Sequence, residues 1–82
     1  MRVLRFSQGD ANLVELTLPA DAPLVGTGIG EVDWPEDTAL VAVLRGGRVV
    51  VPTPEDPLEG GDELLFVAAP DREQQLEDLL NR

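Results

Sequence analysis

Two arginines flank a pair of glycines in the order Arg45-Gly46-Gly47-Arg48, and their spacing is the strongest chemical signal in the chain. A guanidinium group donates up to five hydrogen bonds in one plane and suits paired contacts to phosphate or carboxylate oxygens. The chain has six basic residues in total, so two within four positions concentrate positive charge. The pattern leaves two interpretations open. Either the arginines contact an anionic ligand, or they form a solvated hairpin tip or ion pairs with the surrounding acids, which is the commoner situation on protein surfaces.

The residue types that usually carry catalysis are scarce. The sequence contains no histidine, cysteine, lysine or tyrosine, and its single serine, Ser7, has no histidine or lysine to activate it. A pair of carboxylates, which the sixteen acids supply in number, also needs a substrate cleft, and a domain of 82 residues seldom forms one alone. We therefore expect a protein that is not an enzyme.

Two further patterns are weaker. The run Gly26-Thr27-Gly28-Ile29-Gly30 has neither the spacing of a dinucleotide-binding loop nor the lysine of a phosphate loop, so it predicts a tight helix packed closely on the sheet. Acids that could hold a hard cation such as calcium cluster at Asp56, Glu59, Asp62 and Glu63. They lack a known loop pattern, and acids are common in exposed turns. We expect Asp62 to accept backbone N–H bonds in a turn.

The arginines must be positioned by a β-hairpin. Apolar and β-branched residues lie on both sides of Gly46-Gly47, from residue 37 to residue 52, and two glycines suit a two-residue turn that requires positive φ at both positions. This register places Arg45 directly opposite Arg48. Because like charges facing each other are destabilising, we expect the loss of Arg45 to change the stability of the fold little.

The other elements follow from periodicity. Residues 13–18 alternate between apolar and polar and predict a strand with one apolar face, and residues 62–69 predict a buried strand. Residues 70–80 predict a helix with Asp71 as its N-cap, Gln74 in a capping box and a leucine stripe. Residues 23–32 predict a short, poor helix weakened by three glycines, and residues 1–10 predict an edge strand or a connection to a preceding domain.

This order of elements predicts an α+β fold with a small, mainly antiparallel sheet of about four strands, a short helix and a C-terminal helix. The net charge of −10 opposes contact with nucleic acid or an anionic membrane. No apolar run approaches the roughly 18 residues of a membrane span, and the first residues lack a signal-peptide core. We expect a cytoplasmic domain without direct membrane insertion.

Several ordered features resemble the RCK C-terminal domain, also called TrkA-C. They are a strand ending at Pro19, then Pro23-Leu24-Val25-Gly26, an apolar strand ending at Arg45, Pro52 after a short turn, and Gly61-Asp62 before Leu64-Leu65-Phe66-Val67. The similarity covers residues 13–80 and is greatest to the tail of bacterial Trk-type regulators. It implies that residues 11–82 form the regulatory domain and that residues 1–10 join it to a nucleotide-binding domain.

Members of this family regulate potassium channels, potassium uptake systems and cation/proton antiporters. The resemblance implies a homodimer that acts on a membrane transporter or antiporter subunit, at the inner membrane through that partner. In some members the dimer cleft binds cyclic di-AMP, and in others the site binds another ligand or none is known. The resemblance therefore implies no cofactor other than cyclic di-AMP or another small anionic ligand. With Arg48 added from the hairpin, the matching candidate ligand positions are Val43, Leu44, Arg45, Arg48, Val51 and Pro52. The alternative is a structural dimerisation module without a ligand.

The small core also favours self-association, because a domain of this size buries only about 60% of the surface of its unfolded chain. The poor helix supplies the candidate dimer interface, through Leu24, Val25, Ile29 and Val32.

Overall fold

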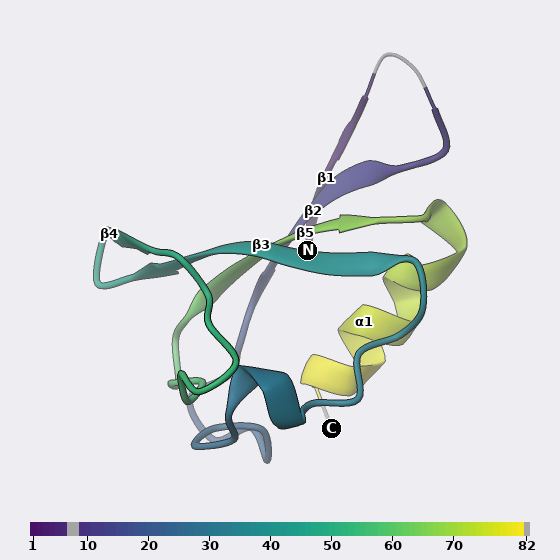
Figure 1. The fold of residues 1–82 in the computed structure, drawn as a ribbon. Coiled ribbons are helices and arrows are strands. Elements are labelled where there is room, and N and C mark those ends of the chain that lie inside the picture. Colours follow the sequence, from purple (N-terminus) through teal and green to yellow (C-terminus); the bar gives the residue numbers. More distant parts are fainter. Residues whose placement is uncertain (7–8, 82) are drawn as a thin grey trace.

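A computed structural model describes residues 1–6 and 9–81. Five antiparallel strands form one sheet, and the helical segments pack on it (Figure 1). In sheet order the strands are β1 (Arg2–Arg5), β2 (Asn12–Thr17), β5 (Glu63–Ala68), β3 (Thr38–Arg45) and β4 (Arg48–Val50). The predicted α+β class and antiparallel sheet are confirmed. The sheet has one strand more than expected, because β1 pairs with β2 as an edge strand.

The predicted hairpin is formed by β3 and β4. Gly46 and Gly47 take φ values of +58° and +77°, which a two-residue primed turn requires. Arg45 is paired with Arg48 in the register, as predicted. The register between β3 and β5 shifts between Leu40 and Ala42, so β3 carries a bulge near its middle.

The predicted helix over residues 23–32 is wrong. The segment consists of turns and one short 3₁₀ helix, η1 (Ile29–Glu31). Its backbone is held by the loop that follows β4: Ile29 N–H donates to Asp56 O at 2.8 Å and Gly30 N–H donates to Pro54 O at 2.9 Å. A Cβ on Gly30 would lie 2.7 Å from Pro54 Cβ, so the glycine permits this approach. The tight helix packed on the sheet that was expected for residues 26–30 is therefore also wrong, because these residues pack on the loop after β4.

The C-terminal helix begins later than predicted. Pro70–Arg72 forms a 3₁₀ turn, η2, and α1 spans Glu73–Leu80. Arg72 occupies the N-cap position and no side chain caps the helix, so the predicted N-cap at Asp71 and the capping box at Gln74 are wrong. The proline at the first position of η2 explains the shift, because it favours an earlier tight turn. Leu76 and Leu80 are buried against the sheet, as the leucine stripe predicts.

The core lies on one face of the sheet. Figure 1 shows η1 and α1 on the same side of the sheet, and the inward side chains of the central strands pack against them. Phe66 on β5 is fully buried, and its ring meets the ring of Trp34 edge to face at a centroid distance of 5.4 Å. Asn12 donates to Glu73 at 2.7 Å and thereby ties β2 to the start of α1.

Candidate ligand site and self-association surface

Arg45 is enclosed by acceptors from the loop before β5. Its Nε and Nη2 donate to Oδ1 and Oδ2 of Asp62, each at 2.8 Å, in a two-pronged contact. Nη2 also donates to the carbonyl of Pro57 at 3.2 Å, and Nη1 lies 2.8 Å from Glu59 Oε2. All three guanidinium nitrogens are therefore occupied. Of the two interpretations of this arginine, the structure contains the ion pair.

Asp62 is the buried half of this network. Its side chain is only 1% exposed, and Oδ2 also accepts the backbone N–H of Glu59 at 2.9 Å, which confirms its predicted role in the turn. Burial alone would raise the pKa of the Asp62 carboxyl, but the hydrogen bonds from Arg45 and Glu59 outweigh burial and lower it. The hydrogen bond to Asp62 raises the pKa of Arg45 further. Asp62 is therefore held as a carboxylate.

Arg48 has the opposite environment. It lies on the edge strand β4, is exposed, and makes no hydrogen bond or ion pair with any residue that the structure describes. Two large apolar side chains follow it on the chain, and both are highly exposed: Val49 at 73% and Val51 at 75%. Val49 pairs with Leu44 and points to the opposite face of the hairpin from Arg48, because consecutive strand residues alternate between faces.

The candidate ligand residues do not share one surface. Val43 is fully buried in the core and is not accessible to a ligand in this structure. Leu44 is partly exposed on the opposite face of the sheet. Pro52 lines a cavity of about 290 Å³ together with Trp34 and Leu40. Of the six, only Arg48 and Val51 are exposed, and no surface shared by all six is formed.

The four candidate interface residues are mostly inside the domain. Ile29 and Val32 are buried in its own core, at 8% and 9% exposure, and Leu24 packs against that core. Val25 alone is exposed, at 38%. These residues were predicted to be buried by a second copy of the chain. They are instead buried by the sheet and by the loop after β4 of the same chain.

A different surface is apolar and uncovered, and we call it the open sheet face. It is the side of the sheet turned away from η1 and α1 (Figure 1). The register places its side chains in three rows across the strands. They are Leu4, Leu13, Val67 and Ala39; then Arg2, Glu15, Leu65 and Ala42; then Thr17, Glu63, Leu44 and Val49. The first row is entirely apolar, and Arg2 lies 4.0 Å from Glu15 in the second.

This face was not predicted as an interaction surface, although the sequence contains a signal for it. The strand residues 64–67 form an unbroken apolar run, and such runs are typical of strands covered on both faces. In the structure Leu64 and Phe66 are buried, whereas Leu65 and Val67 are half-buried on the open sheet face. The run therefore indicates a second layer that this single chain does not supply.

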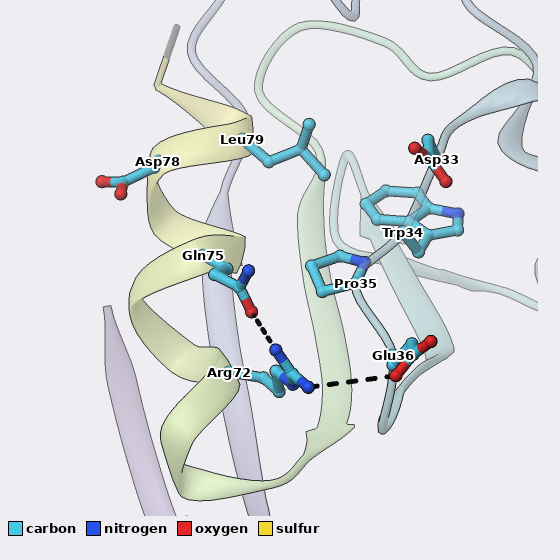
Figure 2. A pocket seen from close by; sticks show the side chains of 8 residues that line it. All are labelled: Asp33, Trp34, Pro35, Glu36, Arg72, Gln75, Asp78 and Leu79. Carbon is cyan, nitrogen blue, oxygen red and sulfur yellow. Dashed lines mark hydrogen bonds and ion pairs between the residues drawn. The ribbon is translucent and has the colours of Figure 1, made fainter.

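A groove next to the helix is lined mainly by polar residues. It has a volume of about 430 Å³ and lies between α1 and residues 33–36 (Figure 2). Arg72 crosses it, donating to Gln75 at 2.9 Å and lying 4.0 Å from Glu36. Trp34 and Leu79 supply its apolar wall. Arg72 therefore has an acidic neighbour at the limit of an ion pair, and among the described residues its buried Nε has no hydrogen-bond partner.

Within residues 1–6 and 9–81, no three acidic side chains are arranged to hold a metal ion. The sequence offered a cation site as the alternative role of four acids, Asp56, Glu59, Asp62 and Glu63. Three of these acids make other contacts, because Glu59 and Asp62 contact Arg45 and Asp56 accepts a hydrogen bond from the Thr53 N–H. Ser7 lies outside the described residues. No helix in the described part of the chain is long and apolar enough to cross a membrane.

Comparison with known proteins decides the family. The model of the TrkA-C domain matches residues 13–81. The chain belongs to the TrkA-C domain family. This confirms the resemblance drawn from the ordered strand, proline and glycine positions.

Curated relatives include the Trk system potassium uptake protein TrkA of two strains of Mycobacterium tuberculosis. Each is 51% identical over 80 residues, which are 98% of this chain and 36% of the relative. The protein of the same name in Halomonas elongata is 33% identical over 72 residues, or 84% of this chain and 16% of the relative. The chain thus spans about a third, or less, of the length of these relatives.

Solved structures share the fold. An RCK_C domain dimer of S. agalactiae BusR in complex with c-di-AMP has a TM-score of 0.74 and 28% identity, covering 84% of this chain and 95% of that one. BusR in complex with its busAB-promotor DNA has a TM-score of 0.76 and 25% identity, covering 95% of this chain and 39% of that one. A structure described as an RCK domain with cda, at 20% identity and a TM-score of 0.75, supports the fold alone.

Proposed function

We propose that this chain is a regulatory, ligand-sensing domain of a potassium-uptake system and that it works as a homodimer. The observation that carries the proposal is 51% identity to the Trk potassium uptake protein TrkA along almost the entire chain. The absence of histidine, cysteine, lysine and tyrosine supports a role without catalysis. Its partner would be a membrane transporter subunit, reached from the cytoplasm. The net charge of −10 argues against DNA contact through this domain.

The open sheet face is the surface that best fits a second copy. Its first row is apolar across four strands, and Leu4 is 62% exposed. Two sheets that pack face to face bury such rows between them. Dimerisation through this face would cover the apolar side chains of β5 that the single domain leaves exposed. This proposed interface replaces the one predicted from Leu24, Val25, Ile29 and Val32.

Cyclic di-AMP is the leading candidate ligand. The RCK_C dimer of BusR, 28% identical to this chain, is a complex with c-di-AMP. A dianionic ligand needs positive charge, and the hairpin tip supplies it in an otherwise acidic chain. The alternative is a dimerisation module without a ligand, and one observation favours it: Arg45, the arginine that the family pattern assigns to the ligand, is fully engaged by Asp62, Glu59 and Pro57.

Two measurements test the proposal. Sedimentation at about 100 μM should give a dimer, and a monomer at that concentration would contradict the homodimer. Calorimetry with cyclic di-AMP should give saturable binding, with cyclic di-GMP as the control for phosphate charge alone. A dimer without measurable heat at millimolar ligand would leave the structural module as the function.

A further inference from the structure

We infer that the free edge of β3, at residues 38–41, binds an extended basic segment of the partner protein as an added strand. The inference rests on the proposed function, in which the partner is a membrane transporter subunit reached from the cytoplasm. It assigns the place where that subunit contacts the domain. Three features carry it: unpaired backbone groups along the edge, an apolar cavity beside them and the sign of the surrounding charge.

The edge is free because β4 is short. Arg45 and Arg48 flank a two-residue turn and bond across it, so every second residue of β4 from Arg48 onward bonds to β3. That series next reaches Pro52, which has no N–H to donate. β4 therefore ends at Val50 and runs beside only the hairpin end of β3 (Figure 1). The rest of β3 is uncovered, and Val41 within it is 47% exposed.

The backbone groups that β4 leaves uncovered point outward at two positions. Ala69 N–H donates to the carbonyl of Asp37 at 2.9 Å, so Asp37 directs its carbonyl at β5. Successive residues of a strand bond to opposite sides, so Thr38 and Leu40 direct their backbone groups away from β5. Among the described residues, these outward groups have no hydrogen-bond partner. A sheet edge of this kind pairs with an extended chain.

A cavity of about 290 Å³ adjoins this edge, and Trp34, Leu40 and Pro54 are among the residues that line it. Leu40 pairs with the buried Phe66, so its side chain lies on the core side of the sheet. A residue placed opposite Leu40 on an added strand would share that face. Its side chain would therefore point towards the cavity, which suits an apolar residue.

The charge around the edge selects a basic partner. Residues 33–37, directly before β3, and residues 52–56, after β4, contain five acids and no basic residue. Of these acids in the described chain, only Glu36 lies within ion-pair distance of an arginine, at 4.0 Å from Arg72. Cytoplasmic loops of membrane proteins carry an excess of lysine and arginine, so an extended loop of the transporter subunit has the complementary charge. A second copy of this chain, at −10, does not.

The test is hydrogen exchange followed by NMR on the full chain, with the amidated peptide Lys-Val-Lys-Leu-Lys-Val-Lys as the probe. At saturating peptide, exchange of the Thr38 and Leu40 N–H groups should slow by about tenfold or more. The Ala39 N–H faces β5 and is the internal control, which should not change. Two control peptides should slow nothing. One has glutamate in place of lysine, and the other has N-methyl groups on its valine and leucine amides, which removes the bonding N–H groups and keeps the charge.

A pair of variants tests the charge separately. Glu55→Lys should weaken binding of the lysine peptide about threefold to tenfold. Asp21→Lys, at an exposed acid in the turn after β2, makes the same change of net charge and should bind as the wild type does. Unchanged melting temperatures show that both variants are folded. Equal weakening by the two variants would mean that net charge alone attracts the peptide, and it would overturn the inference.

The remaining outcomes separate this inference from the proposed function. Unchanged exchange at Thr38 and Leu40 with the lysine peptide overturns the inference, whereas dimerisation and cyclic di-AMP binding still test the function. If both N–H groups are protected in the free protein and lose protection on dilution, a second copy occupies the edge and the inference is wrong. If dimerisation and cyclic di-AMP binding fail while the peptide still slows exchange, the proposed function fails and the docking edge stands.

Discussion

Arg45 and Asp62 form a two-pronged ion pair, with both nitrogen-to-oxygen distances at 2.8 Å, between the end of β3 and the turn before β5. The carboxylate is buried and the guanidinium is 27% exposed. The pair therefore joins the β3–β4 hairpin to residues 57–62 through a buried carboxylate. Its geometry places Arg45 among the residues that hold the fold, although its residue type and position suggested a ligand contact.

Replacing Arg45 with alanine should destabilise the domain by about 2–4 kcal/mol, because Asp62 would remain buried without its partner. The expectation that the stability would change little is wrong in its premise, since Arg45 is bonded to acids and not merely opposed to Arg48. Urea unfolding measures the change. Arg48→Ala is the matched control and should alter stability by less than about 0.5 kcal/mol; equal losses for both arginines would contradict the assignment.

The stability supplied by Asp62 should depend on pH in one direction. The hydrogen bonds from Arg45 and Glu59 hold the pKa of the Asp62 carboxyl below its ordinary value in the folded state. The carboxylate therefore stabilises the fold fully above about pH 4, and this contribution is lost as the pH falls through the folded pKa. The difference in unfolding free energy between wild type and Asp62→Asn should be constant between pH 5 and 7, values well above that pKa. It should shrink below about pH 4. A difference that stays constant down to about pH 2 would show that Asp62 does not contribute in this way.

Gly60 should not tolerate a side chain. A Cβ there would lie 2.7 Å from Ala20 Cα and 2.9 Å from Ala20 O, both backbone atoms that cannot rotate away. Gly60→Ala should cost about 1–3 kcal/mol in thermal or urea unfolding. Gly46→Asn is the control, because Gly46 has open space around it and asparagine tolerates its φ of +58°. A Gly60→Ala variant as stable as the wild type would show that the loop can move aside.

Val67→Glu should separate the dimer if the open sheet face is the interface. Val67 lies in the apolar row with Leu4, Leu13 and Ala39, and burying an unpaired carboxylate there costs several kcal/mol. Sedimentation should show a monomer whose circular dichroism is unchanged. Val25→Glu, on the exposed residue of the originally predicted interface, should remain dimeric. The reverse pattern would restore that interface.

The strands and the hairpin could be predicted because their signals are local. Alternation along residues 13–18 and the Gly46-Gly47 turn each require only neighbouring residues, and both are confirmed. Residues 23–32 could not be predicted in the same way. Their apolar spacing suggested a helix, but Gly26, Ile29 and Gly30 bond to residues 54–58, which lie far along the chain.

The candidate site shows the same division. The two-residue turn pairs Arg45 directly with Arg48 across the hairpin, so this pairing could be predicted from the sequence. The pairing of Arg45 with Asp62 links positions 17 residues apart, and it depends on β3 and β5 being neighbours in the sheet. The alternation of side chains along a strand could have predicted that Val43 and Leu44 lie on different faces of the sheet, because consecutive strand residues point to opposite faces.

The order of the strands also fixes when the domain can form. β1 with β2 and β3 with β4 are two local ribbons, and β5, made after all of them, pairs with both β2 and β3. Until the ribosome has added residues 63–68, neither ribbon has its central partner, and each exposes an unpaired apolar edge. We therefore expect the sheet to form in one late step that depends on contacts between residues far apart in the sequence. A nascent chain that ends before β5 should have no stable partly folded state.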